Sequence, residues 1–110
     1  MAISPNKPGL RERALAYLSR REYSYQELQH KLRLYAQDSD DKNQLDDDIT
    51  ALLEDFKKRG WLSEQRYAEQ IVHARKARFG SLRVANELRG YGVSEEVVAK
   101  AVAEVKQDEV

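Results

Sequence analysis

A chain of 110 residues with 41% hydrophobic and 35% charged residues can form one domain, or two small units that share a core. It contains no cysteine and only two separated histidines, which excludes disulfides and thiolate metal sites and argues against a structural metal centre. No apolar run approaches the ~20 residues of a membrane span and no hydrophobic stretch opens the chain, so we expect a cytoplasmic protein.

The first part of the chain predicts a short arm followed by two helices. Residues 1–9 contain two prolines and a glycine, which is typical of a flexible arm. Apolar side chains at helical spacing predict a first helix over residues 10–21. Ser24 and Glu27 have the Ser-x-x-Glu spacing of a capping box, which predicts a second helix over residues 24–35.

An acidic loop and a third helix follow. Residues 36–44 have almost no apolar side chain, so a solvated loop is expected there. The third helix should begin near Leu45 and end at Gly60, because glycine readily adopts the left-handed conformation found after helix C-termini. Its first turn would then hold three anions that suit the positive end of the helix dipole, namely Asp46, Asp47 and Asp48.

The second half of the chain predicts three more helices. The fourth should extend over residues 63–79, and Trp61 and Leu62 should fill the corner between it and the third helix. Each of the three follows a serine that is the expected N-cap, namely Ser63, Ser81 and Ser94. No useful stretch alternates with period two, so the predicted fold class is all-α, with six helices.

Comparing the chain with itself indicates two copies of a three-helix unit. A shift of 56 residues aligns similar residues up to Tyr35, and a shift of 49 continues the match after the acidic loop. The matched pairs are Leu15/Ile71, Tyr23/Phe79, Leu28/Val84, Leu32/Leu88, Arg33/Arg89, Tyr35/Tyr91, Ile49/Val98, Leu52/Ala101, Leu53/Val102 and Phe56/Val105.

The repeat predicts the domain organisation. We expect a flexible arm at 1–9 and tandem three-helix, helix-turn-helix-like repeats over residues 10–59 and 60–110. Because a unit of about fifty residues buries little surface alone, each should pack mainly on its neighbour. The result would be an elongated, right-handed or curved array of helices.

The net charge of zero is the sum of blocks with unlike sign. Residues 1–35, 36–56, 57–93 and 94–110 carry +4, −7, +6 and −3. A basic face can therefore exist on a neutral protein. We expect that a concave basic face for acidic protein surfaces or phosphates is formed by Arg20, Arg21, Arg66, Arg75, Lys76, Arg78, Arg83 and Arg89.

Simpler roles remain open for these cations. They can serve only as solubilising surface charges, and Lys76 and Arg83 should face solvent in either case. Arg75 falls on the core side of its helix and can pair with Glu87. For Arg89, too, a structural ion pair is the better interpretation.

No set of catalytic, cofactor-binding or metal-binding residues is recognisable. There is no Ser/His/Asp set and no glycine-rich phosphate loop, and the acidic residues 38–48 lack the turn glycine of a cation loop. The six tyrosines fit packing positions better than base stacking, and Trp61 fits a corner plug better than a recognition anchor. We expect a protein that is not an enzyme and needs no cofactor.

Two segments carry an ordered series of specific motifs: RALAYLSRREYSYQELQHKL at 13–32 and GWLSEQRYAEQIVHARKARFGSLRVANELRGYGVSEEVVAKAV at 60–102. The motifs are a Ser-x-x-Glu-Leu-x-x-Lys-Leu second helix, a Gly-aromatic-Leu joint, Arg-aromatic-Ala, Arg-Val-x-x-Glu-Leu and Gly-Val-Ser. Over residues 10–105 the chain resembles the bacterial RecX family, regulators of the recombinase RecA. Family members usually carry a third three-helix unit, which this sequence does not extend to, so we expect weaker inhibition than a three-unit form gives.

The resemblance implies a regulator with a role in recombination, DNA repair and the SOS response. It would bind RecA, lie along the groove of the RecA filament on single-stranded DNA, and inhibit recombinase, ATPase and co-protease activity. The alternative is a small helical DNA-binding module that uses the basic face directly, which the zero net charge and a pI near 6.7 weaken. A monomer is expected, although an exposed sixth helix is able to drive dimerisation.

Overall fold

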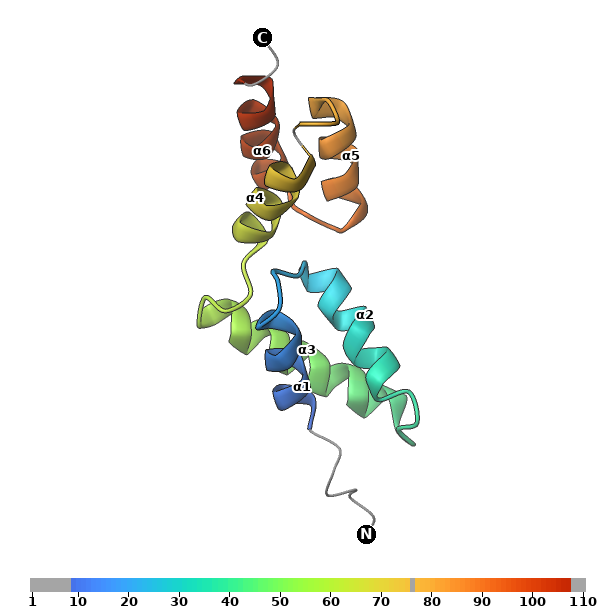
Figure 1. Cartoon of the computed structure of the whole chain (residues 1–110). Helices are drawn as coiled ribbons and strands as arrows, with labels where there is room; N and C mark the ends of the chain where they lie inside the picture. The colour runs from blue at the N-terminus through green and yellow to red at the C-terminus, as the bar shows by residue number, and fades with distance from the viewer. Residues whose placement is uncertain (1–8, 76, 108–110) are drawn as a thin grey trace.

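The computed structural model describes residues 9–75 and 77–107, and within these ranges the chain forms six helices and no strand. The prediction of an all-α fold is therefore confirmed (Figure 1). The helices are α1 Leu10–Leu18, α2 Tyr25–Tyr35, α3 Lys42–Lys58, α4 Glu64–Arg75, α5 Ser81–Gly90 and α6 Glu95–Gln107. In the described part of the chain, no helix combines the length and apolar character needed to cross a membrane.

Three serine caps begin helices as the sequence predicts. Ser24 and Glu27 form a complete capping box, in which the Glu27 backbone N–H donates to Ser24 Oγ at 3.0 Å and the Ser24 N–H donates to Glu27 Oε1 at 3.2 Å. Ser63 and Ser94 each accept a hydrogen bond from the backbone N–H three residues later, at 3.2 and 3.5 Å. These bonds fix the starts of α2, α4 and α6.

The predicted start of α3 is wrong by three residues. Asp41 is the N-cap, and its Oδ1 accepts a hydrogen bond from the Gln44 backbone N–H at 3.0 Å. The three acids at 46–48 therefore lie beyond the first turn, and the helix-dipole role predicted for them is wrong. Asp46 instead pairs with Arg33 of α2, with 2.9 Å between Oδ1 and Nε.

Other helix ends also differ from prediction. α1 ends at Leu18 rather than at residue 21. The hydroxyl of Ser19, the next residue, donates back to the Ala16 carbonyl at 2.7 Å. α4 ends at Arg75 rather than near residue 79, and the backbone N–H groups of residues 78 and 79 both donate to the Arg75 carbonyl in the turn that follows. Ser81 is inside α5, and its predicted cap position is taken by Gly80.

Each three-helix bundle has its own hydrophobic cluster, so the prediction that each unit packs mainly on its neighbour is wrong. One cluster joins α1, α2 and α3 and also takes in Leu62; the other joins α4, α5 and α6. Both contain fully buried large side chains, such as Phe56 in the first and Tyr67 in the second. The division into units at 10–59 and 60–110 stays a prediction.

The internal repeat is visible in the pattern of burial. Four of the matched pairs have both members at 0–1% exposure: Leu28/Val84, Leu32/Leu88, Ile49/Val98 and Phe56/Val105. The match proposed for the first helix of each unit is wrong, because Leu15 is 38% exposed and Ile71 is buried. Ala14 is the buried residue of α1. The register therefore holds in the second and third helices of each unit and fails in the first.

The joint between α3 and α4 contains Gly60 in the predicted left-handed conformation, with φ of 77°. The backbone N–H groups of Trp61 and Leu62 both donate to the Phe56 carbonyl, at 2.9 and 3.2 Å, and this tight turn directs Leu62 into the core. Trp61 is 41% exposed and packs edge-on against the Phe56 ring, with 5.4 Å between centroids. The prediction that Trp61 plugs the corner is wrong, and Leu62 has that role.

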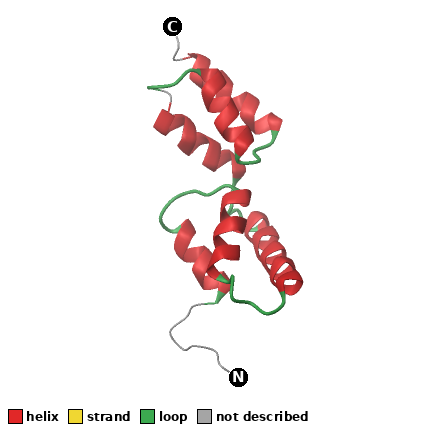
Figure 2. Cartoon of the chain, turned by 90° about the vertical axis from the view of Figure 1, so that its right-hand side faces the viewer, coloured by secondary structure: helices red, strands yellow, loops and turns green. Residues whose placement is uncertain are grey.

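The two bundles lie end to end in an elongated molecule (Figures 1 and 2). Its principal extents are 61 × 24 × 24 Å and its radius of gyration is 16.4 Å. A compact chain of this length would have a radius of gyration of about 13 Å. The molecule is thus a rod in which α1–α3 form one half and α4–α6 form the other.

Candidate functional site

The cations predicted to form a basic face lie in three places. Arg20, Arg21 and Arg66 are near the junction of the two bundles; Arg75, Arg78 and Arg83 surround the α4–α5 turn; and Arg89 is at the end of α5. Lys76 lies outside the described residues. Arg21 and Arg66 are brought together by one residue, since Arg21 Nη1 donates to the Glu22 carbonyl at 2.9 Å and Arg66 Nε donates to its carboxylate at 3.2 Å.

Four of these arginines are engaged in ion pairs. The pairings predicted for two of them are confirmed: Arg75 Nε lies 3.1 Å from Glu87 Oε1, and Arg89 Nε lies 2.7 Å from Glu95 Oε1. The other two pairs are Arg21 with Glu27 at 3.3 Å and Arg66 with Glu22 at 3.2 Å. The hydrogen bond from Arg89 holds the pKa of Glu95 below its usual value. These four cations are largely neutralised within the chain.

Three exposed arginines have no carboxylate partner in the ranges 9–75 and 77–107. They are Arg20, Arg78 and Arg83. The Arg83 guanidinium lies 4.0 Å from the centroid of the Phe79 ring, and that of Arg78 lies 6.0 Å from it. Contact with an aromatic face orders a guanidinium and leaves its N–H donors free. A partner with negative charge can therefore reach these three side chains without breaking an internal ion pair.

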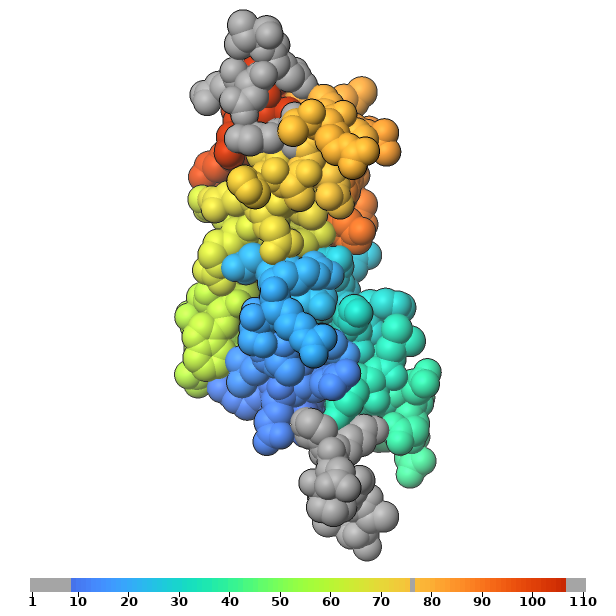
Figure 3. Space-filling model, in the orientation of Figure 1, coloured from blue at the N-terminus to red at the C-terminus, as the bar shows by residue number. Residues whose placement is uncertain are grey.

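The junction of the two bundles is held by polar contacts between segments far apart in the sequence. The Glu22 backbone N–H donates to Gln70 Oε1 at 3.0 Å across the junction, and within the second bundle the Ser94 N–H donates to Glu64 Oε1 at 2.8 Å. Figure 3 shows the light-blue atoms of the α1–α2 connection against the yellow atoms of α4. Sequence reasoning missed Glu22, Glu64 and Gln70, because no local pattern marks a contact over 30 or more residues.

Arg66 and Tyr67 are central to this junction. Arg66 binds Glu22 across the junction and donates from Nη2 to the Gly60 carbonyl at 2.6 Å, so it ties α4 to both the joint and the first bundle. Tyr67 is 1% exposed and meets Tyr91 edge-on, with 6.0 Å between ring centroids. Burial, together with the neighbouring Glu27 carboxylate, raises the pKa of Tyr67. These two residues position the bundles.

Alkaline titration tests the burial of Tyr67. Because the folded state raises the pKa of this phenol, its contribution to stability is complete below the unfolded value of about 10 and is lost as the pH rises above that value. We expect the phenolate absorbance that disappears in Tyr67→Phe to develop above pH ~10, together with loss of helical circular dichroism. Ionisation of Tyr67 near pH ~10 with helicity intact would show that its hydroxyl is not buried.

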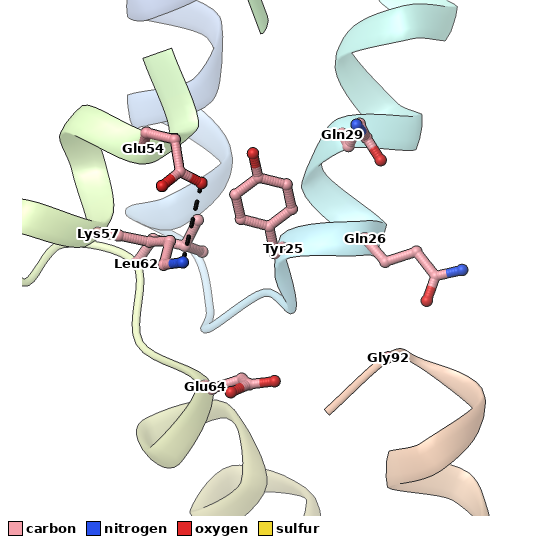
Figure 4. A pocket seen from close by; sticks show the side chains of 8 residues that line it. All are labelled: Tyr25, Gln26, Gln29, Glu54, Lys57, Leu62, Glu64 and Gly92. Carbon is pink, nitrogen blue, oxygen red and sulfur yellow. Dashed lines mark ion pairs between the residues drawn. The ribbon is translucent and has the colours of Figure 1, made fainter. Parts of the chain in front are cut away.

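An open groove of ≈ 560 Å³ lies beside this junction (Figure 4). Its walls come from α2, α3, the joint, the start of α4 and the α5–α6 turn. The lining residues are Tyr25, Gln26, Gln29, Glu54, Lys57, Leu62, Glu64 and Gly92. Figure 4 shows the Tyr25 ring between α2 and the Glu54–Lys57 ion pair, whose atoms are 3.8 Å apart. Burial, aided by the Glu54 carboxylate, raises the pKa of Tyr25. The groove is mostly polar and contains no nucleophile–base pair.

The described residues contain no group of three histidine, aspartate or glutamate side chains that is arranged to hold a metal ion. The candidate functional features identified above are the exposed charged side chains, in particular Arg20, Arg78 and Arg83. Their arrangement fits macromolecular recognition rather than small-molecule chemistry.

Comparisons with known proteins point in one direction. The family model described as "RecX, second three-helix domain" matches residues 63–102. The chain is 42% identical to Regulatory protein RecX of Herminiimonas arsenicoxydans over 92% of its own length, and 42% identical to that of Herbaspirillum seropedicae over 96%. It is 34% identical to that of Ralstonia nicotianae over its whole length. The aligned regions cover 62%, 64% and 65% of these relatives, so the chain spans less than two-thirds of their length.

Proposed function

The chain belongs to the RecX family, and from this we propose that it binds the recombinase RecA on its filament with single-stranded DNA and inhibits strand exchange, ATP hydrolysis and co-protease action. The observation that carries the proposal is similarity over 92–100% of the chain to proteins named as regulatory proteins. That similarity includes both bundles. The names of these relatives describe regulation and not catalysis, which supports a role without enzymatic activity.

The shape of the molecule supports binding to an extended partner. A rod with a long axis of 61 Å has room to touch more than one subunit of a protein filament. Its unpaired cations are distributed along this axis, with Arg20 near the junction and Arg78 and Arg83 near the α4–α5 turn. In this proposal the three arginines meet acidic surface or DNA phosphates, and the four paired arginines keep the rod in shape.

The alternative, a module that binds DNA directly, is weakened by the ion pairs. Affinity for DNA depends on how many phosphates the protein neutralises, and four of the eight candidate cations already have carboxylate partners. The formal net charge of zero also removes long-range attraction. DNA contacts in our proposal are therefore secondary to contacts with RecA.

Binding measurements separate the two functions. We expect the fluorescence anisotropy of the labelled chain to rise on addition of RecA assembled on single-stranded DNA, and to change little with the same DNA alone at about 0.15 M salt. Tight binding to bare DNA without added affinity for the filament would favour the DNA-binding module.

The proposal also includes a cytoplasmic monomer without a cofactor. The absence of cysteine from the sequence supports the cytoplasm, and the two self-contained hydrophobic clusters support a monomer.

A further inference from the structure

The turn between α4 and α5 forms a basic tip with an apolar centre. Leu82 is 71% exposed, more than any other large hydrophobic residue among those described. Arg78 and Arg83 flank it in the sequence and are both ordered against the Phe79 ring, at 6.0 and 4.0 Å. Ordered guanidinium groups beside an exposed leucine are a small version of an interface core with a charged rim. We name Arg78, Leu82 and Arg83 the basic tip.

The connection between α2 and α3 has the opposite charge. Residues 36–48 contain six aspartates and one lysine, and the exposed Leu34, at 51%, lies two residues before them. Asp40 and Asp47 are exposed, and neither carboxylate has a hydrogen-bond or ion-pair partner in the described part of the chain. We name Leu34, Asp40 and Asp47 the acidic end. The proposed regulatory function does not use these residues.

The basic tip and the acidic end lie toward opposite ends of the rod. In Figure 1 the α4–α5 turn is near the upper end and the α2–α3 connection near the lower end, with both bundles between them. Figure 3 shows the two regions exposed on the same side of the molecule. A basic patch and an acidic patch therefore lie far apart along the 61 Å axis, and the two regions of one molecule cannot meet each other.

We propose that the basic tip of one copy binds the acidic end of a second copy, so that the chains associate head to tail. Arg78 and Arg83 would each donate to an aspartate of the neighbour in the planar geometry that guanidinium and carboxylate share. Leu82 and the partner's Leu34 would be shielded between them. The two surfaces thus combine opposite charge with the two most exposed leucines of the described residues, Leu34 and Leu82.

The symmetry and the size of this contact determine what it produces. The contact is heterologous, so every added copy leaves one free tip and one free end, and the product is an open row rather than a closed dimer. A few side chains on each face bury far less than the ~1,200 Å² of a stable interface, so dilute chains remain monomeric. Because the proposed function assigns Arg78 and Arg83 to the RecA filament, these side chains cannot make both contacts at once, and a chain joined to another copy in this way would bind the filament less well.

Sedimentation of the chain by itself tests the contact independently of RecA. We expect the weight-average mass to increase by about twofold as the concentration approaches ~1 mM at ~20 mM salt, and to return to the monomer value at ~0.5 M salt. A monomer mass under all these conditions, or association that is insensitive to salt, would overturn the proposal. RecA inhibition measured in parallel shows whether the proposed function survives that result.

Charge reversal identifies the surfaces. Arg78→Glu with Arg83→Glu in one chain, and Asp40→Lys with Asp47→Lys in another, should each abolish self-association. An equimolar mixture of the two should associate again, because the unchanged tip and end and the two reversed regions are then paired between unlike chains. Lys58→Glu, an exposed substitution in α3 outside both regions, should leave association unchanged. Circular dichroism confirms that each variant is folded. Loss of association in Lys58→Glu, or no recovery in the mixture, would contradict head-to-tail pairing at these residues.

Discussion

Replacing Phe56 with alanine should lower the free energy of unfolding by about 3–5 kcal/mol. Phe56 is fully buried in the first cluster, and its backbone carbonyl also anchors the turn that carries Trp61 and Leu62. Removing its ring leaves a cavity under the joint between the bundles. Denaturant unfolding of both proteins, followed by circular dichroism, measures the loss.

Trp61→Ala is the matched comparison, because Trp61 touches the same ring from outside. Because Trp61 is 41% exposed, its replacement should lower the free energy of unfolding by only about 1 kcal/mol, mainly through loss of the edge-on contact with Phe56. Hydrogen exchange should show that Phe56→Ala weakens the amides of α3 while those of α6 keep most of their protection. An equal loss of unfolding free energy in the two variants would place Trp61 in the core. If Phe56→Ala reduced the hydrogen-exchange protection of α6 as much as that of α3, the two clusters would unfold as one.

Reversing the three unpaired arginines should weaken binding to the RecA filament by at least about tenfold. The variant combines Arg20→Glu, Arg78→Glu and Arg83→Glu. None of these side chains has an ion-pair partner in the described part of the chain, so reversal removes attraction to the partner without breaking an internal pair. Anisotropy titration with RecA on single-stranded DNA measures the change.

The control for this variant has the same change in net charge elsewhere. Lys58→Glu, Lys100→Glu and Lys106→Glu reverse three exposed lysines on α3 and α6 that are outside the predicted basic set. We expect this control to bind nearly as well as the native chain. If both triple variants lose the same affinity, net charge alone matters. If the arginine variant binds normally while folded, the basic-face hypothesis fails.

Local signals in the sequence were sufficient for most of the fold. Ser24 with Glu27, Ser63 and Ser94 predicted helix starts because each cap is a contact over three residues. Gly60 predicted the end of α3 because its conformation is intrinsic to glycine. The exposure of Trp61 was not predictable in this way, since it depends on two N–H groups returning to one carbonyl.

The candidate site was predictable only within a bundle. The Arg75–Glu87 pair spans adjacent helices, and its helical positions were enough to suggest it. The Arg66–Glu22 pair and the bond from Glu22 to Gln70 depend on how the two bundles meet, which no pattern in either segment determines. Sequence reasoning therefore found the cations but could not tell which were engaged in holding the rod together.

ATP hydrolysis by RecA on single-stranded DNA is the most direct test of the central claim. Adding the chain should lower the steady-state rate in proportion to its occupancy of the filament, and the folded arginine-reversal variant should need at least about ten times more protein for the same effect. An unchanged rate at concentrations that saturate binding to the filament would contradict the proposal that this chain regulates RecA.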